Sequence, residues 1–216
     1  MAFGEVGTSL SKIKANGLNL AGTFGFSGTV SGLADETPLV LLSTFTSDGS
    51  DDNATFNSSL ITSTYKEYLF VFNNIHSETD NQDFTFNASV DNGSNYNVTK
   101  TDTYFNAYHT ESDSDAGVQY QKDEDLAQGT GFTNLTKEQA NDNDSGASGF
   151  LKIFNPSSTT FVKHYISHFS YFQHNDYSQN AFKAGYLNTT SAVNNIQFKM
   201  SSGEIQGGTI DLFGVV

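Results

Sequence analysis

The longest strand-like stretch of the chain reads Phe161-Val162-Lys163-His164-Tyr165-Ile166-Ser167-His168-Phe169-Ser170-Tyr171-Phe172. Its odd-numbered positions include Phe161, Tyr165, Phe169 and Tyr171, and its even-numbered positions include Val162, His164, Ile166, His168 and Phe172. Because successive side chains of a strand point to opposite faces, both faces of this segment are substantially apolar or aromatic. We expect the core to cover one face, and another subunit is a candidate for the other.

Further segments of this kind follow one another along the chain, separated by turn signals. Phe84, Phe86, Ala88 and Val90 alternate with polar residues, as a half-buried strand requires, and a turn at 91–94 follows. The other strand-like segments are 39–45, 65–72, 103–108, 150–154, 181–187, 196–200 and 209–215. Regular short strands without helices between them predict an all-β fold, an antiparallel β-sandwich of jelly-roll type with roughly nine to eleven strands.

Composition excludes several classes of protein. The chain has 216 residues and no Cys, so it has no disulfides and no thiolate zinc sites. Its ten basic residues are all Lys, and 24 acidic residues bring the formal charge to −14, which argues against binding to nucleic acid. The sequence predicts no membrane insertion, since no run approaches the roughly 20 apolar residues that a spanning helix needs. The N-terminus lacks the order of a secretory signal.

The chain divides by composition into an arm and a domain. Residues 1–32 contain seven glycines together with apolar residues such as Leu18, Phe24 and Phe26. We expect residues 1–34 to form an extended N-terminal docking or assembly arm, because this segment is too apolar for a solvated linker. Residues 35–216 are expected to form the β-sandwich domain, with a long polar insertion at 111–149 that includes a short helix near 133–140.

The histidines invite a metal or catalytic hypothesis, which the spacing does not support. His164 and His168 are four apart, and in a strand they would lie on one face about 13 Å apart, too far to share a metal ion. His76, His109 and His174 have no recognisable partner. Nucleophile-elbow and phosphate-binding motifs are missing as well. The sequence therefore predicts a protein that is not an enzyme, with no catalytic, cofactor-binding or metal-binding residues assigned.

Two acidic turns leave Ca²⁺ open as an alternative to having no cofactor. Residues 141–146, Asn-Asp-Asn-Asp-Ser-Gly, resemble the first half of a calcium loop, but the closing Glu is absent because Lys152 stands at the twelfth position. Asp48, Asp51 and Asp52 form the second turn. Solvated turn residues are the simpler interpretation of both.

Tyrosines with amide and acidic neighbours suggest a sugar-binding surface. Aromatic faces can stack on pyranose rings, while Asn and Asp bond hydroxyl groups. The candidate contacts are Tyr104, Tyr108, Tyr171 and Tyr177. Ordinary core or interface aromatics are the competing interpretation of each.

Three passages carry a family resemblance. Residues 16–32 form a glycine-punctuated module, 65–76 a strand-like segment, and 196–215 a strand, a turn at Ser202-Gly203 and a final strand. Together they resemble virion structural proteins of marine tailed bacteriophages, including cyanophages, although Phe213 stands where Tyr is more usual. The resemblance implies a β-sandwich on the virion and transfers no catalytic residue.

The sequence thus predicts a virion structural protein, exposed on the particle after assembly in the host cytoplasm. The leading hypothesis is a tail-fibre or appendage component, trimeric, whose arm binds other virion proteins and whose loops, including 111–149, meet a host-surface glycan or protein. The alternative is a capsid decoration (cement) protein, and the third hypothesis is a tail enzyme acting on polysaccharide.

Overall fold

The computed structural model describes residues 38–216, and in this range the all-β prediction is confirmed. Thirteen strands and a single 3₁₀ turn, η1 (Lys122–Glu124), make up the regular structure. Neither η1 nor any other helix within 38–216 has the length and apolar character to cross a membrane. The predicted arm, 1–34, and its boundary with the domain lie outside the described residues.

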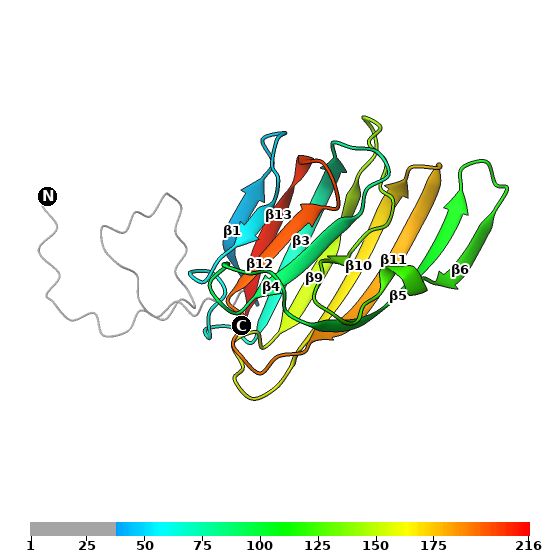
Figure 1. Cartoon of the computed structure of the whole chain (residues 1–216). Helices are drawn as coiled ribbons and strands as arrows, with labels where there is room; N and C mark the ends of the chain where they lie inside the picture. The colour runs from blue at the N-terminus through cyan, green and yellow to red at the C-terminus, as the bar shows by residue number, and fades with distance from the viewer. Residues whose placement is uncertain (1–37) are drawn as a thin grey trace, which may run out of the picture. The chain divides into compact units, whose positions relative to one another are not determined.

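Every pairing between the strands is antiparallel, and they form two sheets (Figure 1). The large sheet has the order β1-β13-β3-β9-β10-β11-β5-β6, with β7 also paired to β5, and the small sheet has the order β2-β12-β4-β8. The large-sheet strands are β1 (Leu39–Thr46), β3 (Glu67–Ser77), β5 (Lys100–Thr110), β6 (Ala116–Tyr120), β7 (Ala127–Gly129), β9 (Ala147–Phe154), β10 (Lys163–Gln173), β11 (Tyr177–Leu187) and β13 (Ile205–Val215). The small-sheet strands are β2 (Ala54–Phe56), β4 (Phe84–Ser89), β8 (Thr133–Asn134) and β12 (Asn195–Met200).

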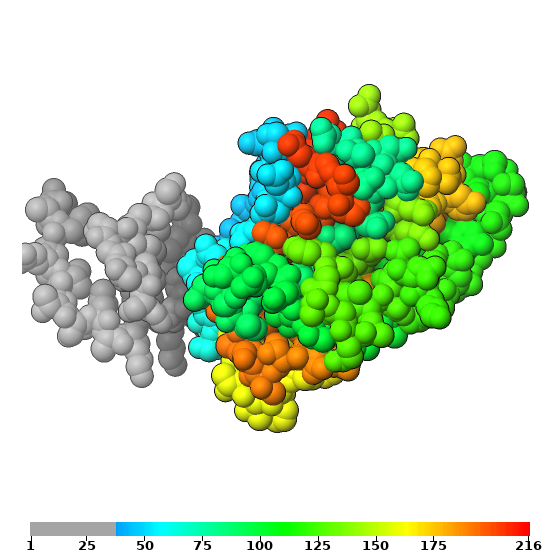
Figure 2. Space-filling model, viewed as in Figure 1, coloured from blue at the N-terminus to red at the C-terminus, as the bar shows by residue number. Residues whose placement is uncertain are grey.

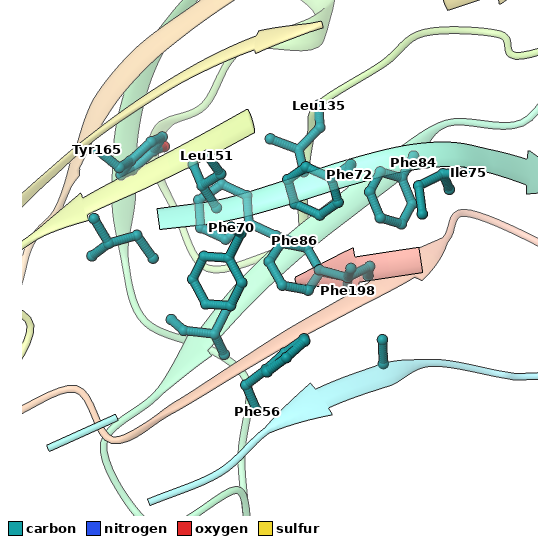
Figure 3. Packing of buried hydrophobic residues seen from close by; sticks show 14 of the residues in the cluster. Phe56, Phe70, Phe72, Ile75, Phe84, Phe86, Leu135, Leu151, Tyr165 and Phe198 are labelled. Atoms are coloured by element: carbon teal, nitrogen blue, oxygen red, sulfur yellow. The ribbon is translucent and has the colours of Figure 1, made fainter. Parts of the chain in front are cut away.

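Aromatic side chains hold the two sheets together. Phe198 of β12 lies among the rings of Phe70 and Phe72 from the large sheet and Phe84 and Phe86 from the small one, with centroid distances of 5.0 to 6.3 Å (Figure 3). Phe198 meets Phe70 and Phe72 edge to face, an arrangement that aromatic quadrupoles favour, and it stacks on Phe84. Alternation places these rings on the inner faces of their strands, as sequence parity predicted for Phe84 and Phe86.

The large sheet is wider than the small one. The small sheet lies over one end of it, whereas β6 stands beyond the small sheet at the other end (Figure 1). Figure 2 views the side that carries the small sheet and the loops beside it. The opposite surface of the large sheet, which we call the outer face, has no second sheet within 38–216.

The short helix expected near 133–140 within the segment 111–149 is not present, and that prediction is wrong. This segment contains β6, η1, β7, β8 and the start of β9. In place of the expected helix near 133–140, Thr133 and Asn134 pair with Phe86 and Thr85 of β4. The Leu135 N–H then donates to the Phe84 carbonyl at 2.7 Å. Backbone groups that a helix would have paired internally are therefore used to extend the small sheet.

Candidate functional site

A polar pocket of about 300 Å³ lies on the inner side of the large sheet. Two tyrosines and a set of amide and charged side chains line it, and we call it the amide pocket. Its residues are Tyr108, Asp115, Gln119, Gln121, Lys137, Gln173, Asn175, Tyr177 and Gln179.

Strand register brings these side chains together. Tyr108 of β5 pairs with Gln179 of β11 and Gly117 of β6. A Cβ at Gly117 would lie 3.0 Å from the Tyr108 hydroxyl, so the glycine leaves room for the ring to lie against β6. Tyr177 meets Tyr108 edge to face at a centroid distance of 5.7 Å and an interplanar angle of 65°. The two rings therefore form a partly exposed aromatic corner.

Buried amides form a chain of hydrogen bonds under the pocket. Asn106 Nδ2 donates to Gln179 Oε1, Gln179 Nε2 donates to Gln173 Oε1 at 3.4 Å, and Gln173 Nε2 donates to Glu138 Oε2. Asn106 is only 1% exposed, yet its Oδ1 has no hydrogen-bond partner among residues 38–216. Buried polar atoms are normally paired, so this acceptor is unused hydrogen-bonding capacity next to Gln179, which lines the pocket.

Tyr104 and Tyr171, two of the four predicted sugar contacts, are buried, and that part of the prediction is wrong. Their hydroxyls lie 3.3 Å apart, and burial raises the pKa of both. The Tyr171 hydroxyl also accepts a hydrogen bond from the Lys137 N–H at 3.1 Å. These tyrosines support the wall of the amide pocket, whereas Tyr108 and Tyr177 line it.

A buried ion pair anchors the same wall to the sheet. Lys183 Nζ lies 2.9 Å from Asp102 Oδ1, and both side chains are almost wholly buried. The Asp102 carboxylate also accepts hydrogen bonds from Thr133 Oγ1 at 2.8 Å, the Leu126 N–H at 2.9 Å and the Tyr165 hydroxyl. Because the charge is surrounded by donors, the pair holds the segment around 124–133 in place.

Carboxylates around Asp83 complete the polar region behind the pocket. Burial raises the pKa of Asp83, with Glu124 and Glu138 adding to that rise, while the backbone N–H of Glu138 and the side chain of Asn134 lower it. Lys137 Nζ lies 3.3 Å from Glu124 Oε1 and 3.8 Å from Glu138 Oε1. The lysine charge at the pocket wall is therefore already compensated by the protein.

The histidines lie at separate places. His164 and His168 both point to the outer face of β10, as their parity predicts, and His168 stacks on Phe182 at 4.2 Å. His76 Nε2 lies 2.9 Å from the Asp142 carbonyl, and His109 Nε2 lies 3.2 Å from Asp113 Oδ1. The Nδ1 atom of His174 is buried without a partner among the described residues.

The two acidic turns use their oxygens locally. Asp48 accepts a bond from the Ser50 N–H at 3.0 Å, and Asp51 accepts one from the Asp48 N–H at 2.9 Å. Asp142 and Asp144 line an open hollow beside Glu111 and Asp176. Within 38–216, no three His, Asp or Glu side chains are grouped closely enough to hold a metal ion. Ca²⁺ at these turns stays the alternative to the prediction of no cofactor.

The outer face carries an aromatic and aliphatic surface that sequence parity indicated only for β10. One row of directly paired residues crosses eight strands, from β6 to β1: Tyr120, Phe105, Phe182, His168, Phe150, Val71, Asp211 and Thr44. A second row, from β5 to β1, contains Thr103, Ala184, Ile166, Lys152, Leu69, Phe213 and Leu41. The rings of Phe105 and Phe182 stack at 5.0 Å, so the first row is a continuous ladder.

This surface is open and carries few charged side chains, which are Lys152, Glu67 and Asp211. Phe105, Tyr120, Ile166 and Leu41 are each 44 to 56% exposed. Leu69, Val71 and Phe150 border a shallow hollow of about 430 Å³. Lys152, the one Lys of the two rows, is paired with Glu67 at 2.5 Å. An apolar surface of this extent is typical of an interaction site.

Comparison with known proteins adds no relative to this description, since no family model, no curated protein and no solved structure matches the chain.

Proposed function

We propose that this chain is a structural protein of a bacteriophage particle, a component of a tail fibre or appendage, and that it assembles with copies of itself through the outer face. The observation that carries the assembly role is the exposed ladder from Tyr120 to Phe150. The sequence resemblance to phage virion proteins supports a location of this chain on the virus particle. The chain would be assembled in the host cytoplasm and exposed on the particle exterior.

The charge of the chain favours a second copy as the occupant of the outer face. At a formal charge of −14, two copies repel wherever their acidic surfaces meet. The outer face carries less of this charge, because Glu67 is paired with Lys152, and Asp211, the one carboxylate of the two rows, accepts a hydrogen bond from Thr44 Oγ1. A basic partner, by contrast, would be drawn to the acidic turns rather than to this face.

The size and pattern of the face also fit a homo-oligomer. Eight strands at about 4.8 Å spacing and a shared length of about seven residues span roughly 34 by 23 Å, on the order of 800 Å² per copy, the area of a standard interface. The end at β5 and β11 is aromatic, around Phe105 and Phe182, whereas the end at β3, β13 and β1 mixes Leu69 and Leu41 with Phe213. Head-to-tail contact between these two different ends forms a ring where the rotation between copies closes, which is the arrangement that the predicted homotrimer needs.

The order of the strands supports a jelly roll as the finer description of the sandwich. Four strand pairs are nested along the chain and alternate between the sheets: β1 with β13, β2 with β12, β3 with β9, and β4 with β8. Rolling such a ribbon produces the two Greek keys of the jelly rolls found in viral capsid and lectin domains. On this description β5–β7, β10 and β11 are additions that widen one sheet. The same topology favours capsid decoration as the second candidate.

A charged substitution on the outer face tests the assembly role. In sedimentation velocity at micromolar concentration, we expect the full chain to sediment as a dimer or trimer of 23.5 kDa subunits. Ile166→Glu, on the central strand β10, should shift it to monomer, because burying an unpaired carboxylate weakens association by roughly 10²-fold or more. The matched control Val90→Glu lies outside the face at similar exposure and should keep the wild-type mass.

A monomeric wild-type chain, or an Ile166→Glu variant that associates as the wild type does, would contradict the proposal. Circular dichroism checks that the variant is folded, and Phe105→Glu repeats the test at a different strand if it is not. Imaging the particle then distinguishes the candidates: decoration requires copies over the head, and a fibre role requires them on an appendage.

A further inference from the structure

We propose that the amide pocket binds one neutral sugar unit of a glycan. This inference goes beyond self-assembly and does not depend on it, because the pocket and the outer face lie on opposite sides of the large sheet. Three properties of the pocket carry it: an aromatic corner, free amide groups and a compensated charge.

The aromatic corner provides a surface for the apolar side of a pyranose ring. The C–H groups on one face of such a ring are weakly positive, and the face of a tyrosine ring is negative. Tyr108 and Tyr177 are both partly exposed and stand at 65° to each other. One ring can therefore lie under a sugar while the other meets its edge, which fits a single ring in a pocket of about 300 Å³.

The amides of the pocket suit hydroxyl groups. Each Gln or Asn side chain offers both a donor and an acceptor, and a sugar hydroxyl needs both. The side chains of Gln119, Gln121 and Asn175 make no hydrogen bond to any other residue of 38–216, so their groups are available to a ligand. Gln173 and Gln179 are held in place by the side-chain hydrogen bonds that connect them to each other and to Asn106.

The charge balance of the pocket selects against anions. Lys137 is the one cation of the lining and is occupied by Glu124 and Glu138. Asp115 adds a carboxylate with no salt bridge among the described residues. An acidic sugar would meet this uncompensated negative charge, whereas a neutral sugar would not. The pocket therefore fits a neutral hexose or N-acetylhexosamine better than a sialic or uronic acid.

Saturation-transfer difference NMR on the full chain tests this proposal with defined probes. The probes are the methyl glycosides of glucose, galactose, mannose and N-acetylglucosamine, each at millimolar concentration, with methyl sialoside as the anionic comparison. We expect transfer to at least one neutral glycoside and less to the sialoside. Gln119→Ala should weaken binding about fivefold to tenfold, the effect of one lost hydrogen bond. Tyr177→Leu, which removes the aromatic face, should weaken it further.

Gln206→Ala is the matched control, because Gln206 is an exposed glutamine on β13 away from the pocket, and it should bind as the wild type does. Absence of transfer to all four neutral glycosides would overturn the proposal. So would unchanged binding by both Gln119→Ala and Tyr177→Leu, or a preference for the sialoside. Gln119→Ala changes an exposed side chain, so it remains informative if Tyr177→Leu fails to fold. Sedimentation of the same samples reports assembly separately.

Discussion

Replacing Phe198 with alanine is expected to lower the free energy of unfolding by about 3–5 kcal/mol, the usual cost of removing a fully buried aromatic ring. Phe198 is 0% exposed. Its centroid lies 5.0 Å from that of Phe70 and 5.1 Å from that of Phe72, so its loss opens a cavity between the two sheets. These neighbours belong to strands of the large sheet, which cannot move inward without breaking their own ladders.

Urea denaturation followed by circular dichroism measures this loss. Phe161→Ala is the matched control, since Phe161 is 69% exposed and should change stability by less than about 0.5 kcal/mol. Equal effects of the two substitutions would show that the sheets do not pack around Phe198.

Lys100→Met is expected to remove a rise in stability that the wild-type chain shows between neutral and alkaline pH. Burial lowers the pKa of Lys100 to about 7; Asp102 partly offsets this and Lys183 adds to it. Its Nζ donates to Asn87 Oδ1 at 2.6 Å and to the Val98 carbonyl at 2.9 Å, so the side chain is held in the interior. The pKa is 10.5 in the unfolded chain, so folding releases a proton between these two pKa values.

The sign follows from that release. Below pH 7 the buried Lys100 amine is charged in the folded chain, and its desolvation lowers the free energy of unfolding in full. As pH rises from 7 toward 10.5, the folded chain holds this amine neutral, and the free energy of unfolding increases. From about pH 6.5 to pH 9, the wild type should gain roughly 2–3 kcal/mol relative to Lys100→Met. Urea titrations at both pH values measure the difference. Lys122→Met, at an exposed position, should keep the wild-type pH dependence, and a Lys100→Met variant that also keeps it would refute the argument.

Much of the fold could be predicted from the sequence because the core strands have clear patterns. The segments 39–45, 84–90 and 196–200 coincide closely with β1, β4 and β12. β4 and β12 are largely buried, and β1 is half-buried on one face, so each contains enough apolar or aromatic residues to be recognised as a strand. The order of the strands in each sheet could not be predicted from the sequence, since it depends on contacts between distant segments.

The strands that the sequence did not predict are β2, β6, β7 and β8. In β2, Ala54 and Phe56 are buried, but three residues are too few to show a pattern, whereas β6 and β7 have no buried residue. In β6, Val118 is 75% exposed, and the strand is held by backbone bonds to β5. The two-residue strand β8 lies in a segment whose polar residues favoured a helix, and its pairing with β4 overrides that local preference.

In the candidate site, too, the sequence does not determine which single residues are exposed. Tyr104 and Tyr108 share one face of β5, and sequence alone gives them equal weight as sugar contacts. Tyr104 is buried in the core, whereas Tyr108 lies four residues further along, at the amide pocket. The tertiary fold decides which part of a sheet is covered by other segments. Alternation along a strand therefore predicts the face on which a side chain lies, but not how exposed it is.

The outer face is the central claim, and cysteine protection tests it most directly because the chain contains no native Cys. Ile166→Cys places a thiol on the face, and Val90→Cys places one of similar exposure outside it. At concentrations where the chain assembles, we predict that a maleimide modifies the thiol of Ile166→Cys at least about tenfold more slowly than that of Val90→Cys, with the difference vanishing on dilution to monomer. Equal rates for the two thiols at every concentration would contradict the account.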